Sequence, residues 1–234
     1  MLPEIKIREI IPIKLEGGYL IDGFPSVGFS SVIASESMIH TSNFELAGII
    51  DSESFPPISI IKNGIPNFPT RIFVNKSLKV GVFLSYFTLE ESLHRVTANA
   101  MLEWAKKHKI ELIVSSVAIK DPKGNEEMIG IGSTESSREK IKDAGLKVLE
   151  HGTVPGILLN EGSMKKQDVI VIIFHTDGKG PDFKSSANLC LAMSKLIPGA
   201  SCNIPSLQKE AEKAEGMIKE AQEESKHLKD YMYR

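Results

Sequence analysis

The chain has 234 residues, of which 41% are hydrophobic and 25% are charged, and its formal net charge is −2. These values suit one sizeable domain with an appendage, and they leave no basic surplus that would attract nucleic acid. The longest apolar runs, such as "VIVIIF", are too short to span a bilayer, and the first ten residues lack the apolar stretch of a signal peptide. We therefore expect no nucleic-acid partner and no membrane partner.

The first half of the chain alternates strand-like and helix-like segments. Strands are predicted at residues 17–24, 44–51 and 78–87, and helices at residues 27–40 and 88–109. The second helix has the strongest pattern, with Thr88 as its expected cap, Glu91 at the capping-box position and an apolar stripe. The stripe consists of Leu93, Val96, Ala100 and Trp104.

Residues 56–75 interrupt this alternation with four prolines and two strand-like pieces. Proline cannot donate a hydrogen bond to a sheet, so Pro66 and Pro69 confine this part to a sheet edge or a loop. We expect antiparallel excursions here.

The second half continues the alternation. Strands are predicted at residues 110–119 and 168–176, and helices at 134–145 and 181–199, while 153–162 is interpreted as a loop followed by a short apolar segment. Several strands are apolar throughout, which is typical of strands covered on both faces. The predicted fold is therefore α/β: a three-layer sandwich with a largely parallel central sheet.

We divide the chain into an α/β core domain (residues 1–204), a C-terminal helical arm (205–230) and a C-terminal tail (231–234). Apolar and small residues of the arm recur in alternating steps of four and three, which is a weak heptad pattern. They are Leu207, Ala211, Ala214, Ile218, Ala221, Ser225, Leu228 and Met232. The arm is expected to hold the tail away from the body, to pack on the body, or to zip against a second copy.

The turn "DGFPSVGFSS" follows a strand and enters a helix, where α/β proteins often bind anions. Gly23, Ser26 and Gly28 are the candidate anion-binding residues. Pro25 removes a backbone N–H that a phosphate would use, and neither a dinucleotide-binding nor a nucleophile-elbow pattern is complete. The alternative is a tight turn whose glycines allow close packing.

Other polar residues do not assemble into a catalytic set. Glu91 and His94 have the spacing of di-iron helices, but no second Glu-x-x-His occurs in the chain. His175, Asp177 and Asp182 follow a strand end without an assignable partner. We therefore predict no catalytic residue, no metal and no cofactor. Cys190 and Cys202 are the only cysteines, so we expect a reduced, cytoplasmic protein.

Four stretches, in this order, resemble the proteasome assembly chaperone family in its archaeal form. They are "GYLIDGFPSVGFSSVIA", "SSVAIKDPKGN", "TVPGILLNEG" and "SSANLCLAMSKLIPGASCNIPSLQKEAEKAEG", and the similarity covers residues 15–216. The resemblance implies a fold similar to nucleoside phosphorylases and peptidyl-tRNA hydrolases. It also implies a non-enzymatic, ATP-independent homo-oligomer that helps to assemble the α-subunit ring of the 20S proteasome.

The resemblance also assigns a role to the last residues, because family members carry a C-terminal hydrophobic–tyrosine–any tripeptide. Met232, Tyr233 and Arg234 fit this pattern position by position. The tyrosine ring would anchor the tail, the carboxylate of Arg234 would pair with a lysine between α subunits, and Met232 would pack on the pocket wall. Two other interpretations stay open: a nucleoside phosphorylase- or hydrolase-type enzyme using the Gly23–Gly28 turn, and an oligomeric scaffold without a proteasome contact.

Overall fold

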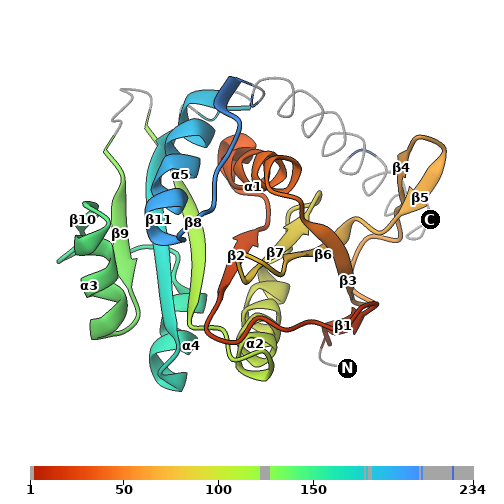
Figure 1. Cartoon of the computed structure of the whole chain (residues 1–234), viewed down its shortest axis with the longest axis horizontal. Helices are drawn as coiled ribbons and strands as arrows, with labels where there is room; N and C mark the ends of the chain where they lie inside the picture. Colours follow the sequence, from red (N-terminus) through yellow and green to blue (C-terminus); the bar gives the residue numbers. More distant parts are fainter. Residues whose placement is uncertain are drawn as a thin grey trace.

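The structure is a computed structural model that describes residues 3–121, 127–176, 178, 181–205, 207 and 223. In these residues strands and helices alternate along the chain, with the helices lying on both sides of a twisted sheet (Figure 1). The three-layer α/β class predicted from the sequence is confirmed.

The described strands have between two and nine residues. They are β1 (Lys6–Glu9), β2 (Tyr19–Gly23), β3 (Glu45–Asp51), β4 (Ile60–Lys62), β5 (Ile65–Asn67), β6 (Thr70–Asn75), β7 (Val80–Ser85), β8 (Leu112–Lys120), β9 (Ile129–Gly132), β10 (Lys147–Val148) and β11 (Asp168–Thr176). The helices are η1 (Val27–Phe29, a 3₁₀ turn), α1 (Ser30–Thr41), α2 (Glu91–Lys107), α3 (Glu135–Asp143), α4 (Ile157–Lys165) and α5 (Phe183–Leu196).

Nine of these strands form one sheet in the order β1-β3-β6-β7-β2-β8-β11-β9-β10. The four central strands, β7, β2, β8 and β11, are mutually parallel. Antiparallel pairs flank them on both sides, through β6 and β3 on one side and β9 on the other. The parallel arrangement expected from the sequence thus holds at the centre of a mixed sheet. β4 and β5 form a separate antiparallel hairpin, which fits the edge position expected from Pro66, but β6 of the same stretch is an interior strand of the main sheet, which was not expected.

Two apolar layers hold the helices against the sheet. Alternate residues of each central strand point to opposite faces, because side chains alternate along a strand. Ile21 and Val114 belong to the layer under α1 and α5, whereas Leu20 and Ile113 belong to the layer with α2 and α4. Burial on both faces explains why these strands have no polar alternation.

Three local predictions need correction. Thr88 does not cap α2, because the helix begins at Glu91 and its N-cap position is the extended residue Glu90, which makes no side-chain cap. The segment 153–162, interpreted as a loop with a short apolar piece, contains the start of helix α4. Gly162, which would normally discourage a helix, lies where a Cβ would come within 2.5 Å of the Val169 side chain, so it lets α4 approach β11 closely. The edge strands β1 and β10 were not predicted.

The structure describes the first residues of the predicted arm, where the chain leaves the α/β body. Ile204, Pro205 and Leu207 are helical, and Leu207 is buried in the layer under α1 and α5. Apart from these residues and Glu223, the predicted arm lies outside the described residues. Within the described ranges, no helix is both long enough and apolar enough to span a membrane.

Candidate functional site

The predicted anion-binding turn lies at the carboxyl end of the parallel strands. Gly23 ends β2, Ser26 precedes η1, and Gly28 lies inside the 3₁₀ turn that leads into α1. The chain leaves β2 toward α1 on one face, whereas the neighbouring β7 leads to α2 on the other. Sites in open α/β sheets commonly form where adjacent strands diverge in this way.

Both glycines of this turn are required by close packing. A Cβ at Gly23 would lie 2.8 Å from the Phe83 carbonyl oxygen and 2.8 Å from Ser35 Oγ. A Cβ at Gly28 would lie 2.7 Å from Thr176 Oγ1, and Gly28 also has a φ of +75°. This geometry supports the alternative interpretation of the motif, a tight turn whose glycines allow close packing. An anion-binding role for the turn stays a prediction.

Hydroxyl groups link the turn to the neighbouring strand. Ser26 Oγ lies 2.8 Å from Ser31 Oγ, which lies 2.8 Å from Ser116 Oγ of β8. The chain of hydrogen bonds therefore runs from the turn through the first residues of α1 to the sheet. These hydrogen bonds give each of the three hydroxyl groups a partner, without which their burial would cost free energy.

A carboxylate lies beside this chain of hydroxyls. Asp22 of β2 accepts a hydrogen bond from Ser115 Oγ at 2.7 Å and one from the Phe24 backbone N–H at 3.2 Å. Burial raises the pKa of Asp22, and these two hydrogen bonds, with the nearby His94, oppose the increase only in part. The surroundings that disfavour charge on Asp22 also disfavour an uncompensated anion beside it. Sequence reasoning missed this pair because Asp22 and Ser115 are 93 residues apart.

The other polar residues noted at the end of β11 have structural roles where they are described. Asp182 is the N-cap of α5 and accepts hydrogen bonds from the Ser185 backbone N–H and hydroxyl at 2.8 and 2.7 Å. His175 is half-buried, and its carbonyl oxygen accepts a hydrogen bond from Ser185 Oγ. Asp177 lies outside the described residues. Within the part of the chain that the structure describes, no three metal-ligating side chains are grouped to hold an ion.

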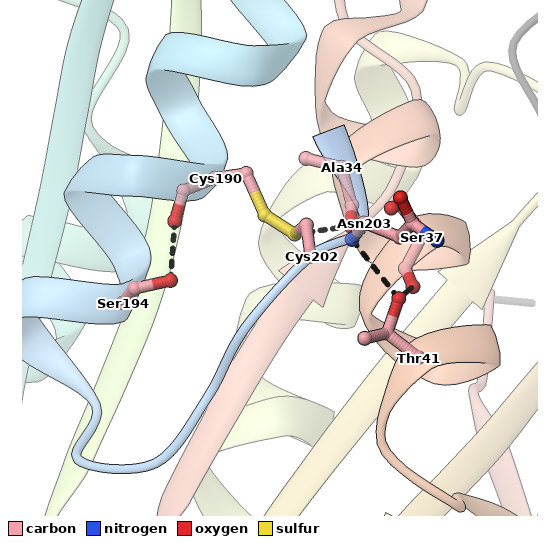
Figure 2. The surroundings of a disulfide bond; sticks show 7 residues. All are labelled: Ala34, Ser37, Thr41, Cys190, Ser194, Cys202 and Asn203. Atoms are coloured by element: carbon pink, nitrogen blue, oxygen red, sulfur yellow. Dashed lines mark hydrogen bonds between the residues drawn. A yellow bond between two sulfur atoms is a disulfide. The ribbon is translucent and has the colours of Figure 1, made fainter. Parts of the chain in front are cut away.

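The two cysteines are joined. Cys190 of α5 and Cys202, in the segment after α5, form a disulfide (Figure 2). The expectation of two reduced cysteines is wrong for this structure, because the chain after α5 turns back and brings the two residues together. The pair lies at the base of the segment that leads to the predicted arm. The predicted docking residues Met232, Tyr233 and Arg234 lie outside the described residues.

The sequence matches the PAC2 family over residues 20–222. The chain belongs to the PAC2 family. This match covers the whole α/β body from β2 onward and extends into the predicted arm.

Individual proteins of known sequence or structure are similar to this chain along nearly their whole length. A protein of Methanocaldococcus jannaschii is 28% identical over 98% of this chain and 94% of its own. The crystal structure of Pyrococcus furiosus PbaA, described as an archaeal homolog of proteasome-assembly chaperone, is 26% identical with a TM-score of 0.79, covering 96% of this chain and 100% of that one. Pyrococcus furiosus PbaB, described as an archaeal proteasome activator, has a TM-score of 0.74 at 16% identity over 94% of this chain and 99% of that one, which shows a shared fold alone.

Proposed function

We propose that this PAC2 family protein is an ATP-independent chaperone or adaptor that docks on α subunits of the 20S proteasome, in the cytoplasm, without catalysing a reaction. The observation that carries the proposal is the likeness to PbaA in both sequence and fold, which covers 96% of this chain. The family match over residues 20–222 supports the same conclusion.

We assign the docking contact to the tripeptide Met232-Tyr233-Arg234. A tyrosine ring buries a large apolar surface at little cost in conformational entropy, and its hydroxyl can stay hydrated. The terminal carboxylate of Arg234 would form a charge-assisted hydrogen bond with a lysine in a pocket between neighbouring α subunits. Met232 would fill the adjacent apolar wall.

We further propose that the protein acts as a homo-oligomer. A three-residue contact is weak by itself, whereas several tails on one assembly bind a ring together, and their effective concentration raises the overall affinity by orders of magnitude. In this arrangement the α/β body provides the contacts between copies, and the arm sets the reach of each tail.

The geometry at the Gly23–Gly28 turn favours this function over the enzymatic alternative. Phosphate would find no N–H at Pro25 and would lie beside Asp22, where burial disfavours negative charge. The hydroxyl groups of Ser26 and Ser31 are engaged in hydrogen bonds with each other. These features support a structural turn.

The decisive experiment compares the full chain with a chain ending at Tyr231 for binding to the assembled α ring from the same source. Native mass spectrometry counts the bound copies, and surface plasmon resonance gives the affinity. We expect the full chain to bind and the shortened chain to lose binding while keeping its circular dichroism spectrum and Tm. Equal binding by both would place the contact on the body, and binding by neither would overturn the proposed function.

A further inference from the structure

The segment that leads from the body to the C-terminal arm is held to the body by a covalent bond. Cys190 lies in α5, Cys202 lies 12 residues later, and the two Cα atoms are 6.3 Å apart. In Figure 2 the segment after α5 runs back past the helix, so that Cys202 lies between α5 and α1. The disulfide therefore closes the loop between α5 and the arm.

Non-covalent contacts continue this attachment on the α1 side. The backbone N–H of Asn203 donates a hydrogen bond to Thr41 Oγ1 at 3.0 Å, and Cys202 Sγ lies 3.6 Å from the Ala34 carbonyl oxygen (Figure 2). Leu207 is 2% exposed and packs in the apolar layer under α1 and α5. Ala200 is buried in the same layer, so beyond the disulfide this segment is attached to the body by non-covalent contacts alone.

We propose that the Cys190–Cys202 disulfide is a redox-controlled tether that fixes where the C-terminal arm leaves the body. In the oxidised protein, Cys202 is bonded to α5 and the arm starts from a fixed position. In the reduced protein, this segment keeps its non-covalent contacts, among them those of Ala200, Asn203 and Leu207, but loses the covalent bond to α5 and detaches more often. In a reducing cytoplasm, a disulfide in such a position responds to the supply of dithiol reductants.

The exchange chemistry is directed by the burial of the two sulfurs. Cys190 is 1% exposed, whereas Cys202 is partly exposed, so the thiolate of a dithiol reductant attacks the Cys202 sulfur. This step forms a mixed disulfide on Cys202 and releases Cys190 as a thiolate, which takes up a proton. The second thiol of the reductant then releases the Cys202 thiolate and closes an oxidised cyclic disulfide. Two electrons pass from the dithiol to the protein.

The expected consequence is a local change and not global unfolding. A disulfide restricts the open state of the loop that it closes, so its loss raises the population of that open state. Neither cysteine is needed to connect the sheet strands, whose backbone hydrogen bonds and apolar layers are independent of this loop. The effect should therefore be confined to the segment after α5.

Hydrogen exchange of the full chain tests the tether. The oxidised protein, the protein reduced with dithiothreitol and the Cys190→Ser/Cys202→Ser variant are compared by mass spectrometry. On reduction, peptides covering residues 198–207 should exchange on the order of tenfold to a hundredfold faster. Peptides from β8 and β11 serve as the internal control and should not change. The variant should exchange fast in both conditions.

Three outcomes would overturn the proposal. The first is unchanged exchange of residues 198–207 on reduction, and the second is an acceleration that spreads to β8 and β11, which would identify the disulfide as a staple of the whole fold. The third is a disulfide that excess dithiothreitol cannot reduce in the folded protein. Thiol labelling under the same conditions distinguishes the third outcome from the first.

The importance of the tether for docking rests on the proposed function, and a second measurement separates the two. Binding to the α ring is measured for the oxidised and the reduced full chain. A change in affinity together with faster exchange supports both proposals. Faster exchange without any ring binding leaves the tether supported and overturns the proposed function. Ring binding together with unchanged exchange supports the proposed function and overturns the tether.

Discussion

Gly28 lies directly against Thr176: a Cβ on Gly28 would be 2.7 Å from Thr176 Oγ1. The Gly28 carbonyl oxygen also accepts a hydrogen bond from the backbone N–H of Asp182 at 3.0 Å. The turn after β2 is thereby joined to the end of β11 and to the start of α5. A motif that looks like half of a phosphate loop in the sequence connects two parts of the fold that are about 150 residues apart.

This contact predicts that Gly28→Ala destabilises the protein by about 2–4 kcal/mol. The positive φ of +75° contributes about 1 kcal/mol, and the clash with Thr176 contributes the remainder. Gly64→Ala is the matched control, because Gly64 has the same φ of +75° and no atom within 4 Å of the added Cβ. Urea unfolding should show a cost of only about 1 kcal/mol for the control. Equal costs for the two variants would contradict a packing role for Gly28.

The strongest periodic segments were predictable from the sequence, and the weakest were not. The apolar stripe of residues 88–109 predicted α2 correctly. Leu93 and Trp104 of that stripe are both buried in the structure. β1 was missed because it is four residues long and is defined by its pairing with β3, a contact that no local pattern records. α4 was missed because Gly162 reads as a break and is in fact a packing position.

For the candidate site, the sequence located the turn but not its surroundings. Gly23 and Gly28 were found because glycine near a strand end is a local signal. The Asp22–Ser115 hydrogen bond and the Cys190–Cys202 disulfide depend on how distant or looped segments meet, so spacing alone could not predict them. The tail was recognised only through its resemblance to a family pattern.

A second prediction concerns Asp168, at the start of β11. Its carboxylate accepts hydrogen bonds from Ser136 and Lys140, each at 2.8 Å, and from Thr134. Burial by itself would raise the pKa of Asp168, but these hydrogen bonds outweigh it and leave the pKa below its usual value. Asp168→Asn should therefore lower the free energy of unfolding at pH 7 by about 1–3 kcal/mol.

The pH dependence follows from the lowered pKa of Asp168. The stabilisation is complete above the unfolded-state pKa of about 3.9 and is lost as the pH falls through the lower folded-state pKa. Wild type and Asp168→Asn should thus converge in stability only below the folded-state pKa of Asp168, which lies under the unfolded-state value of about 3.9. Glu103→Gln, which removes an exposed pair with Lys165, is the control and should have no measurable effect. A difference that persists in acid would contradict the charge-based explanation.

A third prediction separates the terminal carboxylate from the side chain that carries it. Arg234→Ala keeps the carboxylate in place and should leave binding to the α ring within about twofold, because the family pattern accepts any residue there. Deletion of Arg234 moves the carboxylate onto Tyr233 and should reduce binding by at least about tenfold. Surface plasmon resonance on immobilised rings measures both. A large loss for Arg234→Ala would instead assign the contact to the guanidinium.

The last prediction concerns Asp22, whose pKa is raised by burial. The folded state then holds the proton more tightly than the unfolded state, so the stability of the wild type falls as the pH rises from about 3.9 through the folded-state pKa. Asp22→Asn has no charge to bury, and its amide can retain hydrogen bonds to Ser115 and to the Phe24 N–H. The variant should have a higher Tm than the wild type at pH 7, and the advantage should disappear in acid, where both side chains are neutral.

Ser115→Ala tests the same site from the donor side. The substitution removes a hydrogen bond that favours the charged carboxylate, so the pKa of Asp22 should rise further. The loss of stability with rising pH should then continue to a higher pH in this variant than in the wild type. Thermal unfolding of the three proteins across the pH range measures both effects. A Tm of Asp22→Asn below that of the wild type at pH 7 would mean that the ionised carboxylate stabilises this end of the sheet, and the Gly23–Gly28 turn would then have to be reconsidered as a site for a cationic group.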